Sequence, residues 1–284
     1  MKGNGMEAAK YLRKAENRIG RVFWILSLFV LIALWASPSA LALSGREIMQ
    51  KVNDREDGDN QISDMEMVLI DRQGKKRSRT IRSFRSDKGK DSQSLMFFLS
   101  PADTKNTGFL TYDYDAEGKD DDQWLYLPAL RKTKRIAGGD KSGSFMGSDL
   151  NFSDLSRPDL NDYNYKVMKE TEVDGQKTWQ IQAEPKTPDV AEESGYSKSV
   201  VWVRQDNFVM VRAVRWVHKS RRLKYFQVKE LKQMDGIWVA TKVQMVTKEG
   251  KTTIHGTLLN LSNVKFNQKM EEGMFSIRRL EKGL

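Results

Sequence analysis

The chain has 284 residues, a formal net charge of +10 and no cysteine. The lack of cysteine excludes a disulfide framework and thiol chemistry, so stability has to come from packing. Acidic and basic residues are both abundant, with 38 Asp and Glu against 48 Lys and Arg, which is typical of an ordinary solvated surface with a mild basic excess.

Residues 1–42 have the three-part anatomy of a secretory signal peptide. A basic segment precedes an apolar run from Val22 to Ala36, and Ala40-Leu41-Ala42 offers a small-x-small cleavage site. The run has about 15 residues, whereas a membrane-spanning helix needs about 20. We therefore favour a cleaved signal over an uncleaved anchor, and we expect residues 43–284 to form one exported domain.

One short amphipathic helix is expected at the start of the mature chain. Ser44 is a candidate N-cap with Glu47 three positions later, and the helical pattern ends near Asp54. The period then changes to the alternation of strands separated by turns. The expected strands cover residues 63–69, 77–86, 93–100, 108–114, 124–127, 163–173, 177–183, 198–204, 208–217, 223–234, 237–247 and 252–264. Residues 186–196 are expected to be a loop, and Met270–Phe275 a single helical turn.

The stretch from Asp122 to Leu155 is the most distinctive part of the sequence. A short strand turns at Pro128 into a second strand rich in Arg and Lys, and a Gly- and Ser-rich loop follows from Gly138 to Gly147. We expect this loop to form a mobile gate at the rim of the sheet.

About a dozen strands with one clear helix indicate a mainly β fold of antiparallel strands. Such a sheet has more apolar surface than one or two helices can cover, so it has to close or curl around an apolar cavity. Large and partly flexible side chains are the candidates for lining this cavity. They are Met65, Met67, Leu69, Leu95, Phe97, Leu99, Phe109, Trp124, Tyr126, Trp202, Met210 and Trp216.

Catalytic and metal-binding patterns are weak throughout. His218 and His255 each lie at or near an expected strand, outside any zinc-binding spacing. The acidic clusters after Asp54 and Asp113 are better explained as turns than as calcium loops. Gly138 to Gly147 has the composition of a phosphate loop without its spacing. We predict no enzyme activity, no catalytic residue, no metal and no cofactor, with a hydrolase of envelope material as a weaker alternative.

The run WLYLPALRKTKRIAGGDKSGSFMGSDLNFSDL, from Trp124 to Leu155, resembles the signature of the outer-membrane lipoprotein-sorting proteins, relatives of the lipoprotein carrier LolA. Weaker similarity extends over the rest of the mature chain. The resemblance implies a single curved antiparallel sheet, an unclosed or half barrel of the LolA/LolB type, with a few short helices over its concave face. In those carriers an arginine on an early strand holds a helical lid, and Arg77, Arg79, Arg82 and Arg85 all remain candidates for it here. The candidate lid and rim residues are Arg79, Arg82, Arg131, Lys132, Lys134, Arg135, Phe145 and Met146.

The resemblance further implies a monomeric periplasmic carrier in a Gram-negative cell, which binds the acyl chains of lipid or lipoprotein for transport toward the outer membrane. The alternative is an accessory or sensor protein that does not carry lipid and works with an envelope exporter of the resistance-nodulation-division (RND) type. Partners would be acyl chains and an inner-membrane RND-type exporter or an outer-membrane acceptor, with no nucleic acid.

Overall fold

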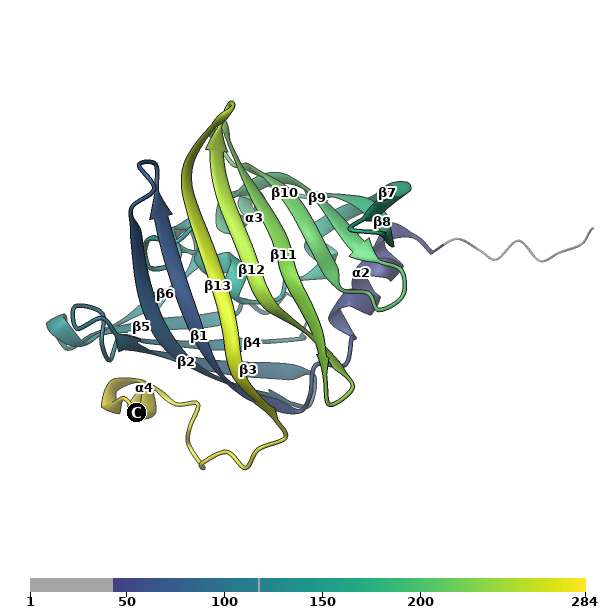
Figure 1. Cartoon of the computed structure of the whole chain (residues 1–284). Coiled ribbons are helices and arrows are strands. Elements are labelled where there is room, and N and C mark those ends of the chain that lie inside the picture. Colours follow the sequence, from purple (N-terminus) through teal and green to yellow (C-terminus); the bar gives the residue numbers. More distant parts are fainter. Residues whose placement is uncertain (1–42, 117) are drawn as a thin grey trace, which may run out of the picture. The chain divides into compact units, whose positions relative to one another are not determined.

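A single curved sheet of antiparallel strands dominates the computed structural model, which describes residues 43–116 and 118–284 (Figure 1). The strands are β1 (Asn60–Asp71), β2 (Lys76–Lys88), β3 (Asp91–Ser100), β4 (Gly108–Asp113), β5 (Asp122–Leu127), β6 (Lys132–Ile136), β7 (Tyr163–Val173), β8 (Gln176–Pro185), β9 (Tyr196–Arg204), β10 (Met210–Val217), β11 (Arg222–Met234), β12 (Ile237–Glu249) and β13 (Thr252–Phe266). The helices are α2 (Gly45–Asn53), α3 (Pro188–Ser194) and α4 (Ile277–Lys282). The expected signal peptide, residues 1–42, lies outside the described residues.

The sheet consists of two meanders that meet at the pair β1 and β13. Its order is β6-β5-β4-β3-β2-β1-β13-β12-β11-β10-β9-β8-β7. The described strands β6 and β7 are therefore its two edges, and the barrel is not closed. This confirms the expected mainly β, unclosed architecture. Residues 137–162, which we call the belt, connect the two edge strands.

Helix α2 shows how a local signal fixes an element. The Ser44 hydroxyl accepts a hydrogen bond from the Glu47 backbone N–H at 3.2 Å, and the Glu47 carboxylate accepts one from the Ser44 backbone N–H at 2.7 Å. This reciprocal capping box satisfies two amide groups that the first turn leaves unpaired. Ile48 and Met49 are buried. The predicted helix is confirmed.

Strand register separates the apolar side chains of the sheet into two rows. Phe109 lies opposite Met96 and Leu125, whereas its neighbour Leu110 lies opposite Leu95 and Trp124. Directly opposed residues share a face and successive residues alternate between faces. We call the face that carries Phe109 the inner face and the face that carries Leu110 the outer face.

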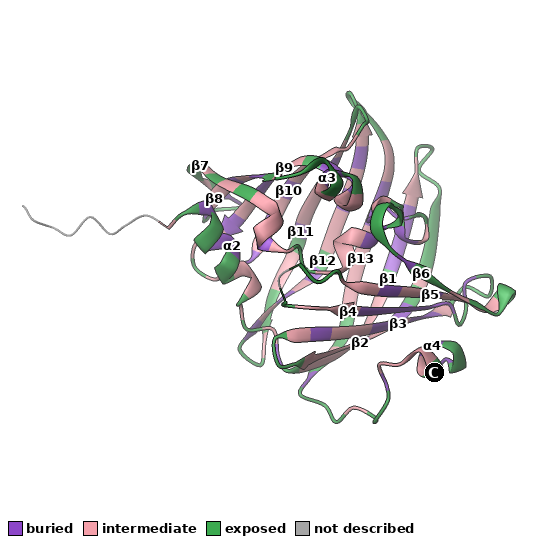
Figure 2. Ribbon diagram, turned by 180° about the vertical axis from the view of Figure 1, so that it is seen from behind, coloured by how far each residue is buried: buried purple, intermediate pink, exposed green. Residues whose placement is uncertain are grey.

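The two faces have different covers. The belt packs on the inner face, and α3 contacts β8, β9 and the belt; Figure 2 looks onto this concave side. Helix α4 packs on the outer face, where Leu280 is buried with Phe97 and Leu110. Gly108 leaves room for that contact, because a Cβ atom there would lie 2.6 Å from Leu280 Cδ1.

Two expectations about short helices are wrong. Residues 186–196 contain α3, which starts after the N-cap Thr187 with Pro188 in its first turn, a signal for a helix start. The C-terminal helix begins at Ile277, beyond the expected turn at 270–275, because Ser276 is its N-cap. It also covers the outer rather than the concave face.

Candidate functional site

The belt fills the middle of the inner face with its own apolar side chains. Phe145 has 0% of its surface exposed, and its ring centroid lies 5.1 Å from that of Phe109 and 6.1 Å from that of Phe98. Phe152 packs on Phe109 with a centroid distance of 5.6 Å. Leu150 belongs to the same buried cluster. The inner face is therefore an apolar surface that the chain itself covers.

The segment expected to form a gate is anchored to the sheet by its apolar residues, and its mobility stays a prediction. Met146 is half-buried against the same cluster as Phe145. Met146 and Gly147 have positive φ angles of 50° and 72°, so the Gly- and Ser-rich sequence provides a tight turn that points Phe145 into the sheet. The composition indicated a loop correctly. Phe145 anchors this loop in the sheet, whereas Gly143, Ser144 and Gly147 around it are exposed.

A buried carboxylate fastens the belt to β12 and β13. The hydroxyl groups of Thr247 and Thr257 donate to Asp149, the latter at 2.7 Å, and His255 Nδ1 lies 2.7 Å from Asp149 Oδ2. The Asp149 backbone N–H donates to Thr257 Oγ1 at 2.9 Å. Multiple partners of this kind are what a carboxylate with 3% exposure requires. His255 thus has a structural role here.

A second polar cluster holds the belt against β9, β10 and β11. Asp154 accepts hydrogen bonds from Arg215 and, at 2.8 Å, from the Tyr196 hydroxyl, and Lys224 donates to the Asn151 side chain at 2.6 Å. Burial raises the pKa of Tyr196 and nearby Asp154 adds to the rise. Burial also lowers the pKa of Lys224, against the attraction of Asp154.

Arg79 is the arginine of β2 that reaches the belt. Its guanidinium donates to the carbonyl oxygen of Met146, and burial lowers its pKa, assisted by Arg77. Arg82 instead pairs with Asp64 at 2.8 Å on the outer face, and Arg85 pairs with Asp57 and Asp87. Among the described contacts of these arginines, only Arg79 touches the belt.

The predicted cavity residues divide between the two faces. Met67, Leu69 and Phe109 are buried in the inner cluster, and Met65 packs against it. Placing Leu95, Phe97, Trp124 and Tyr126 with them is wrong, because these four belong to the outer cluster beneath α4. Leu95 and Trp124 lie opposite Leu110, and Phe97 and Tyr126 are two positions further along the same strands, so all four point to the outer face.

The remaining predicted cavity residues lie away from the inner cluster. Trp202 packs against Val209, Val211 and Val228. The ring of Trp216 lies under Lys198, whose Nζ is 4.4 Å from the ring centroid. Leu99 and Met210 are half-buried.

Several inner-face residues escaped the sequence reasoning. Strand alternation could have identified them, because each lies two positions along a strand from an inner-face residue or directly opposite an inner-face residue in the neighbouring strand. They are Ile81, Met96, Phe98, Leu125, Ile136 and Met245.

The predicted basic rim is the hairpin of β5 and β6. Arg131, Lys132, Lys134 and Arg135 are all exposed. Two of them form surface ion pairs, Lys134 with Asp140 at 2.9 Å and Arg135 with Asp122 at 2.5 Å.

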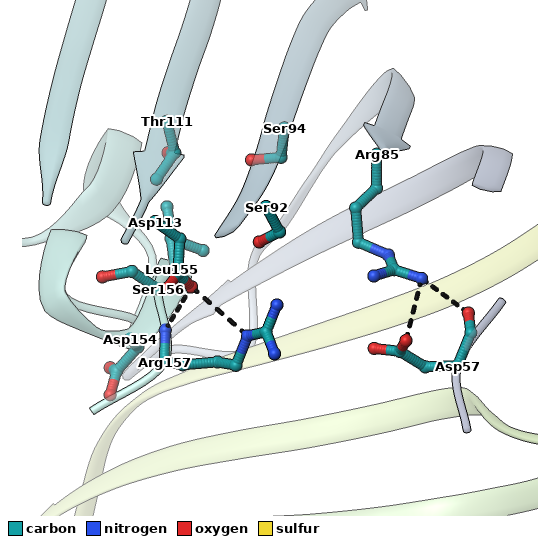
Figure 3. A pocket seen from close by; sticks show the side chains of 10 residues that line it. All are labelled: Asp57, Arg85, Ser92, Ser94, Thr111, Asp113, Asp154, Leu155, Ser156 and Arg157. Carbon is teal, nitrogen blue, oxygen red and sulfur yellow. Dashed lines mark hydrogen bonds and ion pairs between the residues drawn. The ribbon is translucent and has the colours of Figure 1, made fainter. Parts of the chain in front are cut away.

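A polar pocket of about 270 Å³ lies between β2, β3, β4 and the end of the belt (Figure 3). Its lining consists of Asp57, Arg85, Ser92, Ser94, Thr111, Asp113, Asp154, Leu155, Ser156 and Arg157. Burial raises the pKa of Asp113 to about 6, and Asp121 adds to the rise while Arg157 opposes it. A second pocket, of about 550 Å³, lies on the outer face near Phe84 and Met274. Neither lining includes any of the twelve predicted cavity residues.

Within residues 43–116 and 118–284, no cluster of three or more His, Cys, Asp or Glu side chains is arranged to hold a metal ion. No helix in the same part of the chain combines the length and apolarity needed to cross a membrane.

Comparison with known proteins gives both family and fold similarity. A family model described as "-like: Uncharacterized protein" matches residues 90–282. A structure described as an outer membrane lipoprotein-sorting protein domain, from Vibrio parahaemolyticus, is 32% identical with a TM-score of 0.74, covering 84% of this chain and 98% of that one. A DUF1329 family protein from Desulfovibrio piger is 28% identical with a TM-score of 0.74, covering 82% and 96%.

A LolA superfamily protein from Nitrosomonas europaea shares the fold at 16% identity and a TM-score of 0.63, covering 84% of this chain and 99% of that one. A search of curated proteins gave no match.

Proposed function

The chain belongs to the family of outer membrane lipoprotein-sorting proteins, and we propose that it is a periplasmic carrier that holds lipid or lipoprotein acyl chains on its inner face. The observation that carries this proposal is the burial of Phe145, Leu150 and Phe152 against that face. A surface that accommodates these side chains is chemically suited to acyl chains. When the belt lifts, cargo takes the place of the belt's apolar residues.

The exchange of belt for cargo makes reversible binding plausible on energetic grounds. Burying a few hundred Å² of acyl surface is worth several kcal/mol, at roughly 25 cal/mol per Å². Part of that gain is offset because the belt loses its own apolar contacts and because binding costs entropy. Moderate affinity is what a carrier that must also release its cargo requires.

A pair of matched substitutions tests whether belt and cargo compete for the same face. Phe145→Ala empties part of the inner face, so we expect it to raise the affinity for a fluorescent fatty acid severalfold. It should also lower the free energy of unfolding by about 3–5 kcal/mol. The measurement is a fluorescence titration of delipidated protein, with native mass spectrometry to detect bound lipid.

Phe97→Ala is the control, because Phe97 is equally buried but lies under α4 on the outer face. It should cost similar stability without raising the affinity. If either alanine variant fails to fold, the corresponding leucine variants make the same comparison. An equal effect of both substitutions on fatty acid affinity would contradict competition at the inner face.

The alternative is an accessory or sensor protein that works with an RND-type exporter and keeps its inner face closed. The complete burial of Phe145 favours it. Under this alternative, wild type and Phe145→Ala both fail to bind the fatty acid, and the substitution only destabilises the fold. Periplasmic localisation is part of the carrier proposal, and it rests on the expected signal peptide.

A further inference from the structure

The polar pocket of Figure 3 lies on the inner face, beside the apolar cluster that contains Phe109. Phe109, Thr111 and Asp113 follow one another at every second position of β4, so their side chains share the inner face. On β3, Ser94 lies opposite Thr111. Leu155 both lines the pocket and packs against the apolar inner cluster. A molecule bound to the apolar inner face can therefore extend a polar end into the pocket.

The charged groups of the pocket are already paired with one another or with neighbours. Arg85 and Asp57 are 3.1 Å apart, and Arg157 Nε lies 3.6 Å from Asp113. Asp154 is bound by Arg215. Asp57 and Arg157 are partly exposed, whereas Arg85 and Asp113 are more buried. A charged ligand would have to compete with these existing partners for the same groups. The pocket therefore favours an uncharged ligand.

Hydroxyl groups provide the hydrogen-bonding capacity that remains. Thr111 is 2% exposed, and its Oγ1 has no hydrogen-bond partner among the described residues. Ser92 and Ser94 line the same pocket beside Thr111, and Figure 3 shows neither hydroxyl bonded to another of the lining residues. A buried polar group without a partner is unfavourable. A ligand hydroxyl can both donate and accept, so it matches these groups.

We propose that this pocket binds the uncharged, polyhydroxylated head group of an amphiphile whose acyl part lies on the inner face. The inference rests on the proposed carrier function and adds the class of its cargo. A volume of about 270 Å³ is at the small end for ligand sites, which suits a head group of one sugar or polyol. The shared chemistry, adjacent hydroxyl groups, also occurs in free sugars.

Three short amphiphiles with one chain length test the head-group preference. Octyl glucoside, octyl phosphate and octyltrimethylammonium, each below its micellar concentration, compete with the fluorescent fatty acid on purified protein. We expect octyl glucoside to compete at least about tenfold more strongly than the two charged amphiphiles, which is more than one additional hydrogen bond would give. Free glucose, added alone, should compete far more weakly than octyl glucoside.

Substitutions then assign the preference to the pocket. Thr111→Val and Ser94→Ala should each weaken the binding of octyl glucoside about fivefold, the effect of one lost hydrogen bond. The binding of octyl phosphate should weaken less. Thr178→Val is the matched control. Thr178 is also fully buried, but it lies on β8 with its hydroxyl bonded to the Thr171 carbonyl at 3.1 Å, so the preference should persist.

The outcomes separate this inference from the carrier proposal. If the fatty acid binds but octyl phosphate or octyltrimethylammonium competes as well as octyl glucoside, the head-group inference is overturned and the carrier proposal stands. Glucose competing as strongly as octyl glucoside also overturns it, because the pocket would then bind free sugar. If no fatty acid binds wild type or Phe145→Ala, the carrier proposal itself fails.

Discussion

Asp113 is the side chain whose surroundings give this protein a specific pH dependence. Burial raises its pKa from 3.8 to about 6, so the folded protein binds this proton more tightly than the unfolded chain does. Its favourable contribution is complete below pH 3.8 and is lost as the pH rises to about 6. The total loss is up to about 3 kcal/mol of unfolding free energy.

Asp113→Asn should remove this pH dependence. The asparagine oxygen can still accept the hydrogen bond that Asp113 receives from the Arg157 backbone at 2.9 Å, and the side chain carries no charge to desolvate. We expect the variant to be more stable than wild type above pH 6 and to show a flatter profile below it. Urea denaturation between pH 4 and pH 7.5 measures the difference.

Asp64→Asn provides a control of the opposite sign. The hydrogen bond from Arg82 lowers the pKa of Asp64, although burial opposes it. Its stabilising contribution is therefore present above pH 3.8 and is lost as the pH falls below that value. The variant should be less stable than wild type at pH 7. If the free energy of unfolding at pH 7 rises equally in both variants, Asp113 is not the titrating group.

The belt is the element on which the proposed function depends, and Arg79 is its charged contact from β2. Arg79→Gln shortens the side chain and removes a charge-assisted hydrogen bond to the Met146 carbonyl. Bonds of this kind are worth about 1.5–3 kcal/mol. We expect the belt to open more readily, so the amides of Phe145 and Phe152 should exchange at least about tenfold faster with solvent deuterium.

Arg82→Gln is the matched control for that experiment. It lies on the same strand but on the outer face, where it pairs with Asp64. Exchange in the belt should not respond to it. If Arg79→Gln leaves the exchange of Phe145 unchanged, the other contacts of the belt hold it in place and Arg79 does not control it.

Most strands and the helix after Ser44 could be predicted from local sequence patterns, whereas the position of segments with distant partners could not. Helix α3 was missed although Thr187 and Pro188 carry its start signal. The helix after Ser44 follows from a capping box of four adjacent residues. The position of the belt depends on contacts such as that between Asp149 and His255, which are 106 positions apart. Composition indicated a Gly- and Ser-rich loop, but nothing local specifies which surface Phe145 meets.

Strand alternation has a similar limit. In β3, apolar residues occupy both parities, with Leu95 and Phe97 on one face and Met96 and Phe98 on the other. Alternation therefore predicts two apolar faces and cannot tell which is covered by the belt and which by α4. That is why the predicted site mixed inner residues such as Phe109 with outer residues such as Phe97.

At the scale of the whole molecule, the open sheet leaves two edges that closure into a barrel would have removed. The belt joins them along the chain, from the end of β6 to the start of β7. Edge strands offer unpaired backbone groups to other sheets, and charged side chains are a common protection against such pairing. β6 carries three exposed basic residues, Lys132, Lys134 and Arg135.

We therefore expect the protein to be a monomer because its edge is charged, and we expect association when that charge is removed. Lys132→Val combined with Lys134→Val adds β-forming apolar residues to the free edge. Losing the ion pair of Lys134 with Asp140 should cost little, since both side chains are 56% exposed. Sedimentation velocity over a range of concentrations should show dimers or larger species for this variant.

The same charge change away from an edge separates edge pairing from a general loss of solubility. Lys75 and Lys76 are exposed at the turn between β1 and β2, two strands whose neighbours occupy both sides. Lys75→Val combined with Lys76→Val should therefore remain monomeric. Association of both double variants would point to net charge as the cause. A monomeric β6 variant would show that its lysines are not what keeps the edge unpaired.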